Sequence, residues 1–171
     1  MSPVVVLVGP PGAGKTTVGT ALAERLGVPF HDTDSAIVAA TGRTISDIFV
    51  EDGEAAFRAL ERAEVARALG EEAGVVALGG GAVMQEQVAD LLREGDHRVV
   101  FLDVTIADAA SRVGFDASRP LLLVNPRASW TRLMNARRPV YESLATLHVQ
   151  TGSRSPDEVV DEVVAALGLG R

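Results

Sequence analysis

The chain has 171 residues, the length of one domain with a substantial core, and its 47% hydrophobic and 23% charged residues are ordinary for a globular protein. A net charge of −7 argues against a broad surface for nucleic acid or anionic membranes, and the lack of cysteine excludes disulfides, thiolate zinc sites and thiol nucleophiles. Residues 1–3 carry no basic stretch, and the apolar run after them is too short for a signal peptide or a membrane span. We therefore expect a cytoplasmic protein.

The strongest local pattern spans residues 4–17. Five apolar residues predict a buried strand, and the sequence GPPGAGKTT then matches the phosphate-loop pattern G-x-x-x-x-G-K-[ST] between a strand and a helix. Glycines allow successive backbone N–H groups to surround an anion, and the helix that begins at Lys15 directs its positive end towards that anion. We expect Lys15, the only lysine, to reach the β- and γ-phosphates of a nucleotide and the Thr16 hydroxyl to ligate Mg²⁺. The predicted nucleotide-binding residues here are Gly12, Ala13, Gly14, Lys15, Thr16 and Thr17.

Short apolar runs alternate with helical patterns along the whole chain. Strands are expected at 4–8, 28–31, 75–78, 98–102 and 147–151. Helices are expected at 15–26, 35–41, 45–50, 54–69, 85–94, 106–112, from Asn125-Pro126 to about 144, and from a capping box at 155–158 to 167. Residues 113–124 show no regular pattern. Alternation of buried strands and helices without a repeat or linker predicts a single α/β domain, residues 1–171, around a parallel sheet.

Two predictions concern side chains on the expected helices. The long helix at 54–69 is expected to bury an apolar face that includes Ala55, Leu60 and Val65. Trp130, on the helix after Asn125, is expected only to pack.

Two carboxylates, Asp32 and Asp34, follow the second predicted strand. Residues two apart in an extended chain point to the same side, so both are expected to face one cleft at the carboxyl end of the sheet. A phosphate-loop enzyme needs a carboxylate near its Mg²⁺, and the strand at 75–78 ends without one. We therefore predict Asp32 towards Mg²⁺, through water, and Asp34 towards an acceptor hydroxyl. The alternative is that Asp34 only caps the helix beginning at Ser35.

Glycines and arginines indicate the second half of the cleft. Three glycines, 79–81, follow the third strand, and the lack of side chains there lets a small ligand approach backbone N–H groups. Arg58 has Glu61 three residues on, which is positioned to hold the guanidinium. Because guanidinium groups bind carboxylates through two hydrogen bonds, Arg58 and Arg137 together suit an anionic acceptor. Arg119, in the irregular stretch, is either an ordinary surface residue or an arginine that closes over the transferring phosphoryl group.

Several of these motifs together resemble the shikimate kinase family. The matching stretches are GPPGAGKTT at 9–17, DTD at 32–34, TGRTISDIF at 41–49, GEAAFRALE at 53–61, GGGAV at 79–83, SRPLL at 118–122 and RRPVY at 137–141. The phosphate loop alone is shared by many functions, whereas this combination is far more specific. The resemblance implies a nucleoside-monophosphate-kinase-like phosphate-loop fold, a three-layer α/β/α structure whose five-stranded parallel sheet has the order 2-3-1-4-5.

The resemblance also implies a reaction and a set of residues. The reaction is the ATP-dependent phosphorylation of the 3-hydroxyl of shikimate, with Mg²⁺, on the route to chorismate and aromatic amino acids. Asp34 is expected to orient or deprotonate that hydroxyl. The expected shikimate ligands are Asp34, Arg58, Gly80, Gly81 and Arg137, within a substrate segment at about 33–61. Arg119 is expected on the phosphates, in a lid at about 113–124, and adenine is expected between Arg112 and the loop near Pro156. We expect a monomer.

Two other readings compete. A related small-metabolite kinase, such as a gluconate kinase, has a similar architecture, but its acceptor does not call for the paired arginines and the G-E-x-x-F-R segment. A nucleotide-binding regulator or inactive relative is disfavoured because the expected site residues are all retained: Lys15, Thr16, Asp34, Arg58, Arg119 and Arg137.

Overall fold

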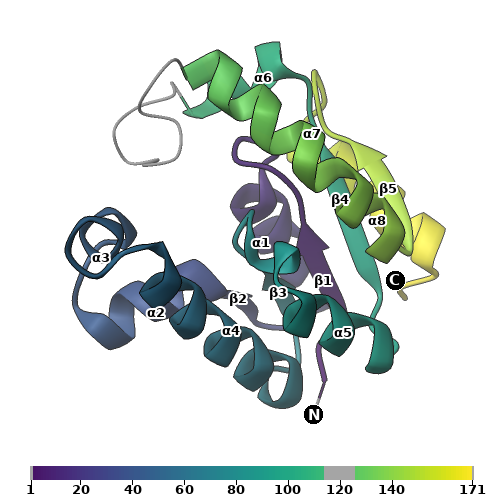
Figure 1. Ribbon diagram of the computed structural model, residues 1–171. Helices are drawn as coiled ribbons and strands as arrows, with labels where there is room; N and C mark the ends of the chain where they lie inside the picture. Colours follow the sequence, from purple (N-terminus) through teal and green to yellow (C-terminus); the bar gives the residue numbers. More distant parts are fainter. Residues whose placement is uncertain (1, 114–125, 171) are drawn as a thin grey trace.

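A five-stranded parallel sheet forms the centre of the protein in the computed structural model, which describes residues 2–113 and 126–170 (Figure 1). The strand order is β2-β3-β1-β4-β5, as the family resemblance implies. β1 pairs with β3 on one side, Val5 opposite Val75, and with β4 on the other, Val6 opposite Val99. The strands are β1 (Val5–Val8), β2 (Phe30–Asp32), β3 (Val75–Ala77), β4 (Val99–Asp103) and β5 (Leu147–Gln150).

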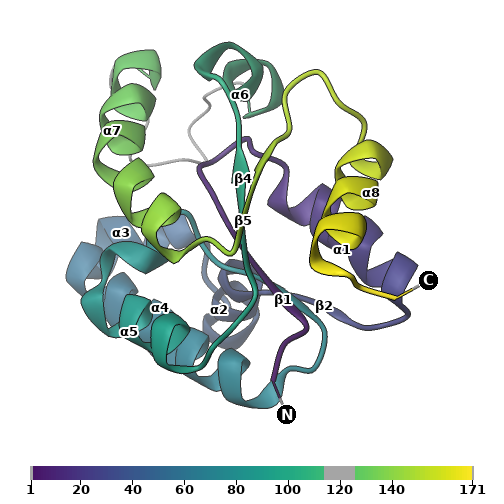
Figure 2. The same cartoon turned by 90° about the vertical axis from the view of Figure 1, so that its right-hand side faces the viewer.

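Helices cover both faces of this sheet. The helices are α1 (Lys15–Leu26), α2 (Thr33–Thr41), α3 (Ile45–Asp52), α4 (Glu54–Glu71), the 3₁₀ turn η1 (Ala82–Met84), α5 (Glu86–Glu94), α6 (Ile106–Val113), α7 (Pro126–Leu144) and α8 (Pro156–Leu167). Figure 2 shows α1 and α8 on one side of the sheet and α4, α5 and α7 on the other. The architecture is therefore the three-layer α/β/α arrangement that the sequence predicts. Within the described ranges, no helix combines the length and the apolar composition needed to cross a membrane.

The three central strands are buried along their whole length, which explains their uninterrupted apolar sequences. Every residue of β1, β3 and β4 is buried, because helices pack on both faces of a parallel sheet. The last helix, α8, begins as predicted with a capping box, in which the Ser155 side chain accepts from Glu158 N–H and the Glu158 side chain accepts from Ser155 N–H.

Two local predictions are wrong in an instructive way. In α4, Ala55 is exposed and Leu60 is 38% exposed, whereas Val65 is buried as expected. The buried face instead runs through Phe57, Glu61 and Val65, four residues apart. A charged residue therefore holds an inner position that apolar periodicity could not assign.

A small second core lies apart from the main one. Ile37 of α2, Ile48 of α3 and Phe57 of α4 are buried against one another, and the partly buried Ile45 and Phe49 pack on them. The main core consists of the residues between the sheet and its two helical layers. The segment between β2 and β3 thus carries its own packing unit.

Candidate active site

The carboxyl ends of β1, β2 and β3 meet at one edge of the sheet and enclose a cavity of about 440 Å³. It is lined by residues of the phosphate loop and α1, by the aspartates at the end of β2 and in the first turn of α2, and by the segment that follows β3: Pro11, Gly12, Gly14, Lys15, Thr16, Thr17, Asp32, Asp34, Leu78, Gly79 and Gly80. Ligands of open α/β sheets bind at this edge. The predicted convergence of strand ends is therefore present.

The phosphate loop is held in the curled conformation that anion binding requires. Gly12 and Gly14 have φ of +87° and +88°, a region that residues with a Cβ rarely adopt. Gly14 is the N-cap of α1, so the positive end of that helix faces the cavity. The Lys15 ammonium lies over the loop, where it donates to Gly9 O at 2.7 Å and to Pro10 O at 3.2 Å.

The two carboxylate oxygens of Asp32 bind different groups: one caps the start of α2, and the other accepts from the residue after Lys15. Its Oδ1 accepts from Ser35 N–H at 3.0 Å, and its Oδ2 accepts from the Thr16 hydroxyl at 3.3 Å. α2 begins at Thr33, two residues earlier than predicted for a helix at 35–41, so the helix cap is Asp32 and not Asp34. The extended-chain argument for two carboxylates on one side is wrong as well, although both still line the cavity because the turn into α2 carries Asp34 there.

The Thr16 hydroxyl oxygen and Asp32 Oδ2 are suited to bind a hard divalent cation. Mg²⁺ prefers oxygen ligands and is held by one or two protein groups together with substrate phosphates and water. The Thr16 hydroxyl and Asp32 carboxylate are of that kind and are adjacent. In residues 2–113 and 126–170, no group of three or more histidine and acidic side chains is arranged as a metal site of its own. A metal at this edge would therefore depend on nucleotide phosphates for most of its ligands.

Asp34 is half-buried, and its Oδ1, which is itself buried, has no hydrogen-bond partner. Burial, reinforced by the nearby Glu61 and Asp32 carboxylates, raises its pKa to about 6, against the opposing charges of Lys15 and Arg58. An oxygen that is desolvated, unpartnered and titrates near neutrality is suited to accept a proton or a hydrogen bond from a hydroxyl group.

Two arginines flank the glycine run. A Cβ on Gly81 would stand 2.6 Å from Arg58 Nη2 and 2.9 Å from Arg137 Nη2, so only glycine allows both guanidinium groups to approach here. Arg58 is held by Glu61, at 2.6 Å from Nη1 to Oε1, and by Glu54 at 3.3 Å. Arg137 is only 5% exposed, and within the described residues no carboxylate forms an ion pair with it. Arg58 is already paired with Glu61 and Glu54, whereas the neighbouring, buried guanidinium of Arg137 has no paired carboxylate among the described residues, so the site favours a further anion at Arg137.

A family model for shikimate kinase matches residues 11–168 of the chain. The chain belongs to the shikimate kinase family. It is 59% identical to a shikimate kinase of Thermobifida fusca over 166 residues, 96% of this chain and 95% of that protein, and 51% identical to one of Streptomyces coelicolor over 98% of this chain and 97% of that protein. Among solved structures, a shikimate kinase from Acinetobacter baumannii in complex with shikimate superposes with a TM-score of 0.92 at 35% identity, covering 98% of this chain and 93% of that one. A gluconokinase from Sinorhizobium meliloti has a TM-score of 0.60 at 21% identity, which shows a shared fold alone.

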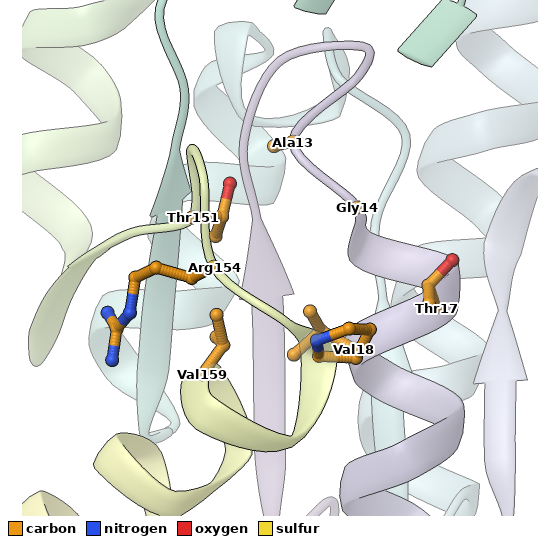
Figure 3. Close-up of a pocket in the computed structure, with 8 residues that line it drawn as sticks. Ala13, Gly14, Thr17, Val18, Thr151, Arg154 and Val159 are labelled. Atoms are coloured by element: carbon orange, nitrogen blue, oxygen red, sulfur yellow. The ribbon is translucent and has the colours of Figure 1, made fainter. Parts of the chain in front are cut away.

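A second cavity of about 250 Å³ opens behind the phosphate loop (Figure 3). It lies between the start of α1 and the segment from β5 to α8, and its lining residues are Ala13, Gly14, Thr17, Val18, Thr151, Arg154, Pro156 and Val159. Pro156, predicted to contact adenine, is therefore placed beside the nucleotide loop. The sequence analysis did not identify Thr151 and Arg154, which belong to no motif and reach this place only through the position of β5.

Three further predictions from the sequence have different outcomes. Arg119 and the lid at about 113–124 lie outside the described residues, except for Val113 at the end of α6, and Arg112 lies in α6 with its side chain outside the description. Trp130, expected only to pack, also donates its indole N–H to Pro11 O at 3.0 Å.

One carboxylate at a strand end escaped the sequence analysis. Asp103 ends β4 and is buried, but Arg138 donates to both of its oxygens, at 2.6 and 2.9 Å, and His148 and Gln150 bind Oδ2 as well. These contacts hold the pKa of Asp103 below its usual value despite burial. Asp103 therefore ties α7 to the sheet and leaves Asp32 and Asp34 as the carboxylates of the cavity.

Proposed function

We propose that this protein transfers the γ-phosphoryl group of ATP to the 3-hydroxyl of shikimate, forming shikimate 3-phosphate and ADP for the synthesis of chorismate and aromatic amino acids. The observation that carries the proposal is the arrangement around Gly81, where Arg58 and Arg137 converge on the glycine run that lines the same cavity as the phosphate loop and Asp34, whose Oδ1 is buried and unpartnered. Membership of the shikimate kinase family supports the same substrates.

On the donor side, the backbone of Gly12 to Gly14 and the side chain of Lys15 bind the phosphates. Mg²⁺ would be held by Thr16 and, through water, by Asp32, and it would neutralise charge on the β- and γ-phosphates. Thr17 and Pro156 border the second cavity, which is of a size and position for the adenine base. Arg112 and Arg119 remain predictions from the family resemblance.

On the acceptor side, Arg58 and Arg137 bind the shikimate carboxylate, while Gly80 and Gly81 let the ring approach the backbone. Asp34 accepts a hydrogen bond from the 3-hydroxyl and takes its proton as the new O–P bond forms and the bond from the γ-phosphorus to the ADP oxygen breaks. Phosphoryl transfer depends chiefly on positioning and charge neutralisation, which these residues supply.

A single chain contains every one of these groups, which supports a working monomer. The requirement for ATP accords with a cytoplasmic location. Light scattering during size-exclusion chromatography, with and without both substrates, measures directly whether the protein is a monomer.

The decisive experiment measures ADP release with and without shikimate in the presence of Mg²⁺. We expect turnover that requires shikimate and is not supported by gluconate, the acceptor of the kinase that shares this fold. The product should carry phosphate on the 3-oxygen, as a ³¹P-coupled NMR spectrum can establish. Protein that binds ATP normally but shows no stimulation by shikimate at any attainable concentration would overturn the proposal.

A further inference from the structure

One face of α7 contacts both halves of the site. Trp130, Arg137 and Tyr141 are seven and four residues apart, a spacing that places all three on the same side of a helix. Trp130 donates to Pro11 O in the phosphate loop, and Tyr141 Oη donates to Gly80 O at 2.5 Å in the glycine run. Arg137 lies between them along the helix, beside Gly80 and Gly81. The helix thus makes one hydrogen bond to each of the two loops.

The Trp130 contact is built as a specific bond. The side chain is only 4% exposed, and a buried indole N–H requires an acceptor, which Pro11 O supplies at 3.0 Å. The two carbonyls before it in the loop, Gly9 O and Pro10 O, both accept from Lys15. Three successive carbonyl groups of the loop are therefore occupied by side-chain donors.

The direction of a carbonyl also decides the direction of an amide. Pro11 C=O and Gly12 N–H belong to one peptide group, in which the two bonds are antiparallel because the peptide is planar and trans. Pro11–Gly12 is the central peptide of a turn closed by the bond from Ala13 N–H to Pro10 O at 3.2 Å, and the φ of +87° at Gly12 is typical of a type II turn. Because glycine adopts either sign of φ, the turn bond by itself does not decide which way this central peptide faces. A donor on Pro11 O therefore fixes the orientation of the Gly12 N–H, and Gly12 lines the main cavity.

We propose that Trp130 is a positioning residue for nucleotide binding, whose indole N–H holds the Pro11–Gly12 peptide in the orientation that receives phosphate. Trp130 acts through the loop and not by touching the nucleotide. The inference rests on the proposed function only in taking a nucleoside phosphate as the ligand of the loop, and shikimate turnover is not needed to test it.

Trp130 is the only tryptophan of the chain, which permits a substitution of single atoms. Biosynthetic replacement by benzothienylalanine keeps the shape of the ring but exchanges N–H for sulfur, and replacement by 5-fluorotryptophan, the matched control, keeps the N–H. Calorimetric titration with Mg·ADP should give a dissociation constant raised about tenfold for the sulfur analogue, the effect of leaving one buried acceptor unpaired, and little change for the fluorinated control. Trp130→Phe should behave like the sulfur analogue.

A purely structural role would give a different pattern. If Trp130 only anchors α7, loss of its bond displaces Arg137 as well, and the KM values for ATP and shikimate rise together. We expect only the ATP value to rise, whereas Tyr141→Phe, which removes the equivalent bond to Gly80, should raise chiefly the shikimate value. Met134→Ala removes a buried side chain of α7 that makes no hydrogen bond to the described residues. It should lower the melting temperature without raising one of the two KM values, for ATP or for shikimate, more than the other. Unchanged Mg·ADP affinity in the sulfur analogue, or equal increases in both KM values, would overturn the proposal.

Discussion

The two halves of the cavity are built in opposite ways. The donor half consists of consecutive residues, 9–17, whose backbone and Lys15 side chain are proposed to bind phosphate, and it follows a strand that is buried along its whole length. The acceptor half collects Asp34 from α2, Arg58 from α4, the glycines after β3 and Arg137 from α7. A site made of one segment depends on local conformation, whereas a site made of four elements depends on how those elements pack.

The packing around the two halves differs accordingly. The strand before the phosphate loop belongs to the main core, while α2, α3 and α4 share a smaller core around Ile48. The acceptor half also contains the costly charges: Glu61 is 1% exposed, and Asp34 has an unpartnered buried oxygen. Such arrangements trade stability for function. The halves should therefore respond separately to mutation, and four variants test that separation.

The largest effect is expected from Lys15→Ala. Loss of the ammonium on the transferring phosphates should lower kcat by about 10³-fold or more, the scale for removing a charge that neutralises a phosphoryl transition state. Lys15→Arg should not restore activity, because a planar fork does not replace a point charge inside the loop. The measurement is steady-state ADP release, with calorimetric titration of shikimate as the control. Shikimate affinity lost to the same degree as activity would show that the halves are not separate.

Asp34→Asn should lower kcat by about 10²- to 10⁴-fold, the usual contribution of a general base. In the unmodified protein, activity should fall as the pH drops through about 6, because Asp34 becomes protonated there. A pH–rate profile with no limb near that value would contradict the assignment.

The same substitution should stabilise the fold. Because the pKa of Asp34 is raised from 3.8 to about 6, the folded state binds the proton more tightly, and stability falls as pH rises between these values. Asp34→Asn removes this cost and should raise the unfolding free energy at pH 7 by about 1–3 kcal/mol. Urea unfolding of both proteins at pH 4 and pH 7 is the measurement. A gain in unfolding free energy that is present at pH 7 and small at pH 4 comes from the lost carboxylate charge, whereas an equal gain at both pH values comes from the amide itself.

Arg137→Ala should raise the KM for shikimate by about 10- to 100-fold, the loss expected for a buried, charge-assisted pair of hydrogen bonds. The KM for ATP should change little. Arg138→Gln is the matched control in the next position: it weakens the contact with Asp103 and should cost stability of about 2 kcal/mol with a much smaller effect on shikimate. Similar shikimate constants for the two variants would show that Arg137 acts through the position of α7.

The smallest effect should come from Ile48→Val in the second core. Removing one methylene should cost about 0.5–1.5 kcal/mol of stability and raise the shikimate KM a few-fold, because α2 and α4 carry Asp34 and Arg58. Val163→Ala, on the buried face of α8 in the main core, should lower stability without changing that constant. A shift in the ATP constant with Ile48→Val would mean that the two cores are coupled.

Local patterns in the amino-acid sequence are enough to predict the donor half and the order of elements. The phosphate loop combines a motif, a buried strand and a helix start in contiguous residues, so its conformation follows from local preferences of glycine and the helix N-terminus. The alternation of apolar runs and helical patterns gave the α/β class, and the sequence limits of most helices are within a few residues of those in the structure.

The surroundings of the acceptor half depend on the folded arrangement of the chain. That Asp32 caps α2 depends on the exact helix start, and that Asp103 is occupied by Arg138 depends on two residues 35 positions apart. The pairing of Arg58 with Glu61 follows from their three-residue spacing, as predicted, but the burial of Glu61 depends on how α4 packs. The contact of Trp130 with Pro11 spans 119 residues, and no local pattern predicts it. The burial, the ion pairs and the pKa values of these side chains arise from neighbours that folding brings together, and the periodicity of the sequence does not predict those neighbours.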